Sequence, residues 1–115
     1  MSRGERRKSF RTESLNLLDY SVSGQNGELV DRGMGRTLNI SEKGILFETH
    51  IPLQRGQILM ITIELEEELL EIGGRIIHVE PSLENFHSGV EYLQMDAKGE
   101  RVLKNYLAAF KKGGF

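Results

Sequence analysis

The stretch that decides the fold class is ILMITIELEEELLEIGGRIIHV, residues 58–79. Its first eight residues are rich in β-branched side chains, and as a strand they would place four apolar residues on one face: Leu59, Ile61, Ile63 and Leu65. The acidic run at 66–68 predicts a turn tip. Residues 69–79 then return as a second strand, with a bend or bulge at Gly73 and Gly74.

Further short strands are predicted on both sides of this stretch. The residues expected to form them are 15–24, 35–41, 45–49 and 85–93. Residues 24–35, GQNGELVDRGMG, carry three turn signals and predict a hairpin connection. Alternation in 35–41 predicts that Leu38 and Ile40 face the core, while Thr37, Asn39 and Ser41 face outward.

The hydrophobic period changes after residue 95. Asp96 is a plausible helix N-cap, and one helical face then collects five apolar or aromatic residues: Val102, Leu103, Tyr106, Leu107 and Phe110. Lys111 and Lys112 suit the last turn of a helix that ends at Gly113 and Gly114. Short strands followed by one amphipathic helix predict a mainly β domain, either a small antiparallel barrel or a sandwich, whose open end or edge the helix covers. We expect one domain over 1–115, with strands in 14–94 and the helix over 96–112.

Composition narrows the function classes. The chain has 115 residues, a formal net charge of −2 and no cysteine. We therefore expect no disulfide and no thiolate chemistry, and the composition fits a cytoplasmic protein. No signal peptide and no apolar run long enough for a membrane span is found, so no membrane insertion is expected. Positive charge gathers at the two ends of the chain, which is not typical of a general nucleic-acid binder.

Catalytic and metal sites find little support. Ser41 has no neighbouring histidine or nucleophile-elbow context, so the chain is not expected to be an enzyme. His50 and His87 lack partners at metal-ligand spacing and are interpreted as surface residues, with no metal site and no cofactor expected.

The front of the chain is unusually basic. Residues 3–13, RGERRKSFRTE, hold five cationic side chains: Arg3, Arg6, Arg7, Lys8 and Arg11. We interpret residues 1–13 as a flexible arm, either a solvated tail or one half of a clamp for a small anion. The second half would be NISEKG, residues 39–44, which offers an amide, a hydroxyl and a glycine turn. There Gly44 would permit positive φ or the close approach of a ligand. An ordinary hairpin turn is the alternative interpretation of this stretch.

These two motifs, in this order, resemble the hallmarks of the PilZ domain family. The family patterns RxxxR and [DN]xSxxG read here as Arg7 to Arg11 and as Asn39, Ser41 and Gly44. GRIIHV at 74–79 and GVEYL at 89–93 resemble later strands of the family. The resemblance implies a six-stranded β-barrel that binds the bacterial second messenger cyclic di-GMP through those five residues.

The resemblance also implies finer details. Arg6, directly before RxxxR, predicts two stacked ligand molecules per protomer. Lys8, Arg75 and His78 are further candidate contacts, although Arg75 and His78 also fit ordinary exposed strand positions. Arginine suits this ligand because its planar fork donates bidentately to phosphate or guanine and stacks on purines. Binding would change the surface that a partner protein reads in motility, biofilm or polysaccharide control. Two alternatives remain: a PilZ-like scaffold that binds no nucleotide, and a small barrel that binds single-stranded nucleic acid.

Overall fold

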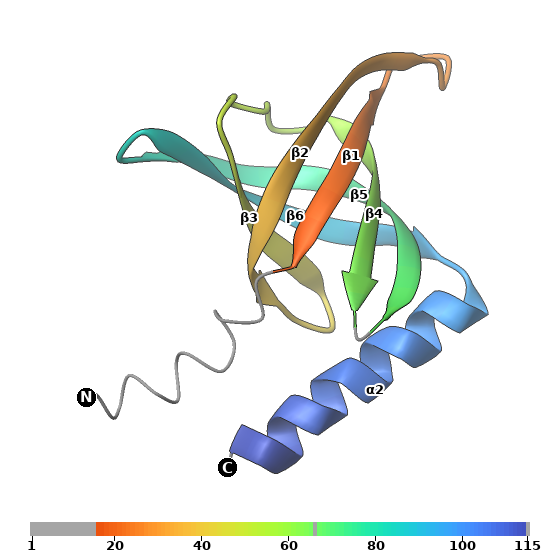
Figure 1. Cartoon of the computed structure of the whole chain (residues 1–115). Coiled ribbons are helices and arrows are strands. Elements are labelled where there is room, and N and C mark those ends of the chain that lie inside the picture. The colour runs from red at the N-terminus through yellow and green to blue at the C-terminus, as the bar shows by residue number, and fades with distance from the viewer. Residues whose placement is uncertain (1–15, 66, 115) are drawn as a thin grey trace.

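The computed structural model describes residues 16–65 and 67–114, with side chains described up to residue 109. Six strands form a closed antiparallel barrel in the order β1-β2-β3-β6-β5-β4, and one helix, α2, follows (Figure 1). The elements are β1 Leu17–Ser23, β2 Leu29–Ile40, β3 Gly44–Thr49, β4 Ile58–Leu65, β5 Glu68–Ser82, β6 Asn85–Met95 and α2 Ala97–Gly114. The predicted mainly β fold with a C-terminal helix is confirmed, and the structure selects the barrel over the sandwich.

The β4–β5 hairpin supplies much of the barrel core, as its sequence predicted. All four inward residues of β4 are at most 1% exposed: Leu59, Ile61, Ile63 and Leu65. The pairing of β5 with β6 shifts register between Gly73 and Gly74, which confirms the predicted bulge. A β-carbon on Gly74 would approach the Val90 side chain and the Glu91 carbonyl oxygen, so glycine allows the close strand contact.

Strand β2 departs from the prediction in two ways. Residues 29–35 were predicted as a connection, but they are strand, and the turn is confined to residues 24–28. Gly33 and Gly35 were read as turn signals, yet they face inward, where β-carbons would collide with Tyr20 and with the Glu48 carbonyl oxygen respectively. Glycine in this strand therefore makes room for neighbouring groups rather than for a turn.

The second departure concerns Thr37. It was predicted to face outward, but it is 2% exposed and lies opposite Phe47. A register shift between Thr37 and Asn39 places an extra residue, Leu38, in β2. This bulge breaks the simple alternation, so that Thr37 and Asn39 face opposite sides although they are two residues apart.

Helix α2 lies across the end of the barrel where β1 begins and β4 ends (Figure 1). The Asp96 side chain accepts a hydrogen bond of 2.7 Å from the Gly99 N–H, as expected of an N-cap. Val102, Leu103 and Tyr106 are buried, which confirms the predicted core-facing stripe over its described part. Among the described residues, no helix has the length and apolar character needed to cross a bilayer.

Candidate functional site

The stretch 39–44 forms a tight turn between β2 and β3, which we call the polar turn. The Ser41 N–H donates to the Gly44 carbonyl oxygen at 2.9 Å. The Ser41 hydroxyl accepts from the N–H groups of Lys43 and Gly44 at 3.1 and 3.2 Å, and it donates to the Gly44 carbonyl at 3.2 Å. A hydroxyl has one donor and two acceptor positions, so these bonds use its full capacity. Ser41 therefore stabilises the conformation of the turn through its hydroxyl.

Gly44 has a different role from the two that its sequence context suggested. Its φ is not positive, and the space beside its α-carbon is filled by β6 rather than open to a ligand. A β-carbon there would collide with the Val90 carbonyl oxygen. Glycine at this position therefore lets β3 approach β6 closely.

Tyr92 of β6, which was not among the predicted site residues, holds the polar turn in place. Its hydroxyl lies 2.7 Å from the Ser41 carbonyl oxygen and 3.2 Å from that of Gly44, and it donates to these carbonyls. Its N–H donates to the Lys43 carbonyl oxygen at 3.2 Å. Burial raises the pKa of Tyr92 far above its ordinary value, so the hydroxyl stays protonated and can donate across the physiological range. In the sequence, the sole indication of this role was that Tyr92 is an aromatic residue in an otherwise amphipathic strand.

The polar turn and the outer faces of β3, β5 and β6 enclose a shallow depression of about 680 Å³. Asn39 and Ser41 line it together with Gly44, so the structure brings these three predicted residues to one surface. Apolar walls come from Leu46 and Ile77. The depression therefore combines an exposed amide with apolar surface, which suits a planar polar ligand.

Arg75 and His78 lie on neighbouring parts of β5. Arg75 forms an ion pair of 3.3 Å with Glu91, which lines the depression. The β-carbon of His78 lies next to Gly89, another lining residue, and its ring nitrogen is 3.3 Å from Glu80. Both side chains are about half exposed, so each is accessible to a ligand yet already has an acidic neighbour.

The chain enters the barrel beside the polar turn. Backbone groups join Asn16 to Thr37, because the Thr37 N–H donates to the Asn16 carbonyl oxygen at 2.9 Å. The Asn16 N–H in turn lies 3.3 Å from the Thr37 hydroxyl, to which it donates. The predicted ligand residues Arg6, Arg7, Lys8 and Arg11 precede this point and lie outside the described residues.

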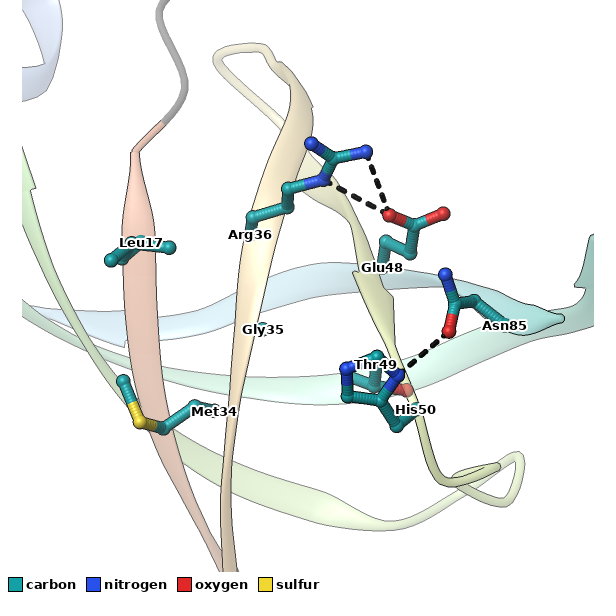
Figure 2. A pocket seen from close by; sticks show the side chains of 8 residues that line it. All are labelled: Leu17, Met34, Gly35, Arg36, Glu48, Thr49, His50 and Asn85. Carbon is teal, nitrogen blue, oxygen red and sulfur yellow. Dashed lines mark hydrogen bonds and ion pairs between the residues drawn. The ribbon is translucent and has the colours of Figure 1, made fainter.

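A second polar cluster lies on the outer face where β2 and β3 meet (Figure 2). Arg36 donates to one carboxylate oxygen of Glu48 at 2.9 and 3.0 Å, and the His87 ring lies 3.3 Å from the other oxygen. His50 contacts the Asn85 side chain at 2.8 Å. His87, interpreted from the sequence as a surface residue, is partly buried on this outer face and paired with Glu48.

The same partners tune the acidity of Glu48. Burial alone would raise the pKa of its carboxyl, but hydrogen bonds from Arg36, His87 and Asn85 and the charge of Arg36 outweigh burial and lower it. Glu48 is therefore a carboxylate at neutral pH that ties β3 to β2 and β6. Among residues 16–65 and 67–114, no three His, Cys, Asp or Glu side chains are arranged to hold a metal ion.

Solved structures share this fold. YcgR from Escherichia coli in complex with c-di-GMP superposes with a TM-score of 0.69 at 11% identity, over 90% of this chain and 44% of that one. K. pneumonia MrkH in its apo state superposes with a TM-score of 0.64 at 16% identity, over 84% of this chain and 47% of that one. The Bacillus subtilis inhibitor of motility (MotI/DgrA) superposes with a TM-score of 0.63 at 19% identity, over 85% of this chain and 50% of that one. The chain thus spans about half the length of each of these structures.

Sequence comparison points the same way at the level of the family. No curated protein matches the chain significantly. The family model described as the PilZ domain matches residues 5–109, which include both predicted motifs and all six strands. The chain therefore belongs to the PilZ domain family.

Proposed function

We propose that this chain is a non-enzymatic receptor for cyclic di-GMP, which it holds between Arg7 and Arg11 and the depression beside the polar turn. Family membership supports this ligand class, as does the fold shared with YcgR, whose solved structure contains c-di-GMP. The ligand is a dianion with two guanines. Arginine can donate bidentately to its phosphates and guanine edges, and it can stack on its purine faces.

The observation that carries the proposal is the pairing of Asn16 with Thr37. It places the start of the described chain two residues from Asn39 in β2. Arg11 precedes Asn16 by five positions, and five extended residues span at most about 18 Å. The segment between Arg11 and Asn16 is therefore long enough to carry the Arg11 side chain from Thr37 to Asn39, which lines the depression.

We assign different roles to the motif residues according to their contacts in the barrel. Asn39 is exposed and can offer its amide to a guanine edge from the barrel wall. The Ser41 hydroxyl is fully used within the polar turn, so a direct bond from it to the ligand would require one turn bond to break. Gly44 acts through the β3–β6 contact. We therefore assign the direct polar contacts to the arginines and Asn39, and we assign the shape of the surface to Ser41 and Gly44.

Energetics explain why both arginines are needed. Ordering eight to ten residues costs on the order of 10 kcal/mol in conformational entropy. A hydrogen bond to a charged group returns about 1.5–3 kcal/mol. Two bidentate arginines therefore roughly balance the cost, and the contacts to the barrel must supply the net affinity.

Two further expectations belong to the proposal, one about ligand stoichiometry and one about signal relay. Arg6 predicts that two stacked ligand molecules bind each protomer, and a calorimetric titration that saturates at one per chain would contradict this. We also propose that the protein acts in the cytoplasm and relays binding to a partner protein, since ligand capture would join the N-terminal segment to the barrel surface and alter what a partner meets.

Isothermal titration calorimetry with cyclic di-GMP tests the proposal. We expect Arg11→Ala to weaken binding about 100-fold, which corresponds to about 2.7 kcal/mol. Arg11→Lys should recover little of it, because an ammonium cannot reproduce the planar fork. Arg55→Ala is the matched control, because Arg55 is exposed in the loop before β4 and does not line the depression, and this variant should bind like the native chain. Native affinity in Arg11→Ala, or no binding by the native chain, would overturn the proposal.

A further inference from the structure

Strand β2 is paired on both of its edges along only part of its length. Its pairing with β1 covers the first two thirds of the strand, from Leu29 to Arg36. Its pairing with β3 begins only at Arg36 and runs to Ile40. Within the described part of the chain, no strand therefore pairs with the second edge of residues 29–35, although Gly35 still lies against β3. We call this segment the free edge.

The sequence explains why β3 leaves β2 at this point. If the register Arg36 to Glu48 continued, His50 would lie opposite Met34 and Pro52 opposite Arg32. Proline has no N–H to donate to a ladder. The chain instead turns outward at Thr49, whose hydroxyl donates to the Ile51 carbonyl oxygen at 2.6 Å. Figure 2 shows β3 bending away at Thr49 and His50 while β2 continues beside Leu17 of β1.

The hydrogen-bond alternation identifies which backbone groups point to the free edge. The Thr37 N–H is directed to β1, where it meets Asn16. In an antiparallel pair the direction alternates from one residue to the next, so the N–H and C=O groups of Arg36, Met34 and Arg32 point away from β1. Consistent with this, the Arg32 N–H is bound by the Asp31 carboxylate at 2.8 Å rather than by a strand. Met34 presents its backbone groups at the same edge.

The side chains along this edge have a definite chemistry. On the outer face, Met34, which is 62% exposed, stands between Arg32 and Arg36. A pocket of about 400 Å³ opens beside Met34 and is lined by Leu17 and Thr49 among others (Figure 2). The inward positions are the glycines at 33 and 35, where Tyr20 and β3 fill the space that a side chain would need. The edge thus offers an apolar site with Arg32 on one side and the Arg36–Glu48 ion pair on the other, while Asp19 of β1 lies opposite Met34.

We propose that the free edge is a docking site for an extended segment of a partner protein, which adds to the barrel as an antiparallel strand beside residues 30–35. Such an addition supplies the missing ladder bonds, while alternate side chains give specificity. The partner places an apolar residue opposite Met34, over the pocket, and an acidic residue opposite Arg32. The barrel already contains this second kind of pair, because Glu48 of β3 lies opposite Arg36 and bonds to it.

The chain itself could provide two other candidate strands for the free edge, β2 of a second copy and the segment 3–13, and the charge of both makes them unfavourable. A second copy of β2 would bring more arginine and no acidic side chain to the outer face, and like charges on facing strands are unfavourable. Residues 3–13 hold five cations against two acids. The docking proposal depends on the geometry of β2 and β3 at this edge, so it does not depend on nucleotide binding.

The probe is the acetylated and amidated peptide Thr-Leu-Thr-Glu-Thr-Val-Thr, which places Leu opposite Met34 and Glu opposite Arg32 when it runs antiparallel to β2. Fluorescence anisotropy of a labelled form, with the full chain, measures binding, and amide NMR shifts locate it. We expect the shifts to concentrate at residues 30–36. N-methylation of Leu and Glu, whose N–H groups face β2, should weaken binding at least about tenfold, whereas N-methylation of the central two Thr residues should leave it nearly unchanged.

A charge exchange provides the matched test on the protein. Arg32→Glu should weaken binding at least about fivefold, and a peptide with Lys in place of Glu should restore it. Absence of binding, shifts elsewhere, or equal effects of both N-methylation patterns would overturn the proposal. Slow hydrogen exchange of the Met34 amide in the free chain would also overturn the proposal, because the edge would then already be covered. Light scattering would identify what covers it: a second copy if the chain is a dimer, or residues 1–15 if it is a monomer.

Discussion

The two ends of β2 have opposite designs. At the polar turn, the strand pairs with β3, Tyr92 holds the turn from β6, and every hydrogen-bonding position of the Ser41 hydroxyl is used. At the free edge, the strand pairs with β1 alone, and the outward side chains are exposed. One end is a hydrogen-bonded turn beside the depression where we propose that the ligand binds, and the other is the edge where we propose that a peptide docks. The proposed ligand site and the proposed docking site thus lie at opposite ends of one strand.

The largest difference between the ends should appear in stability. Gly44→Ala inserts a methyl group against the Val90 carbonyl, and we expect it to lower the free energy of unfolding by about 3 kcal/mol, because two paired strands must separate. Chemical denaturation checks this. Glu42→Ala, an exposed change in the same turn, is the control and should stay within about 0.5 kcal/mol. Similar values for both variants would show that the β3–β6 contact is more adaptable than the structure indicates.

Tyr92→Phe should have the next largest effect. The variant removes the hydroxyl that donates to Ser41 and Gly44, and we expect a loss of about 1 kcal/mol in stability. Because the turn would loosen, cyclic di-GMP should also bind more weakly, by about threefold to tenfold. Tyr20→Phe, a buried change beside Gly33, should leave the affinity unchanged. If both variants bind alike, Tyr92 does not position the turn.

Glu48 lies at the junction between the two ends, and its effect should depend on pH. Its pKa is lowered in the folded state, so its ionised form stabilises the barrel above the pKa of the unfolded chain, and this contribution is lost as pH falls through the folded value. We expect Glu48→Gln to cost about 1 kcal/mol at pH 7 and progressively less under acid conditions. Denaturation curves at pH 7 and pH 4 measure this, and a pH-independent cost would contradict the assigned role of the carboxylate.

The smallest effect is expected at the free edge. Arg32→Ala and Met34→Ala remove exposed side chains, so each should change the free energy of unfolding by less than about 0.5 kcal/mol. The same two variants should reduce peptide binding. A large loss of stability in either would mean that these side chains serve the fold rather than a partner.

The sequence predicted regular elements well and irregular ones poorly. The alternation of β4, the bulge at Gly73 and Gly74 and the cap at Asp96 are local patterns, and all were confirmed. The inward position of Thr37 depends on a bulge that could not be predicted from the residue types in β2. Gly33 and Gly35 were mistaken for turn residues because their purpose, space for Tyr20 and for β3, involves residues distant in sequence.

The candidate site shows the same division. The motif residues Asn39, Ser41 and Gly44 were found from their spacing, and the structure gathers them at one depression. Tyr92 could not be assigned, because its bond to the turn joins residues about fifty positions apart. The free edge was also hidden, since it arises from the early end of β3 and not from a feature of β2 itself.

An amide NMR titration of the full chain with cyclic di-GMP tests the central claim most directly, because it observes both ends of β2 at once. The account predicts large shifts at residues 39–44 and 89–92, together with signals from Arg7 and Arg11, and little change at residues 30–35. No shifts at excess ligand, or shifts confined to the free edge, would contradict it.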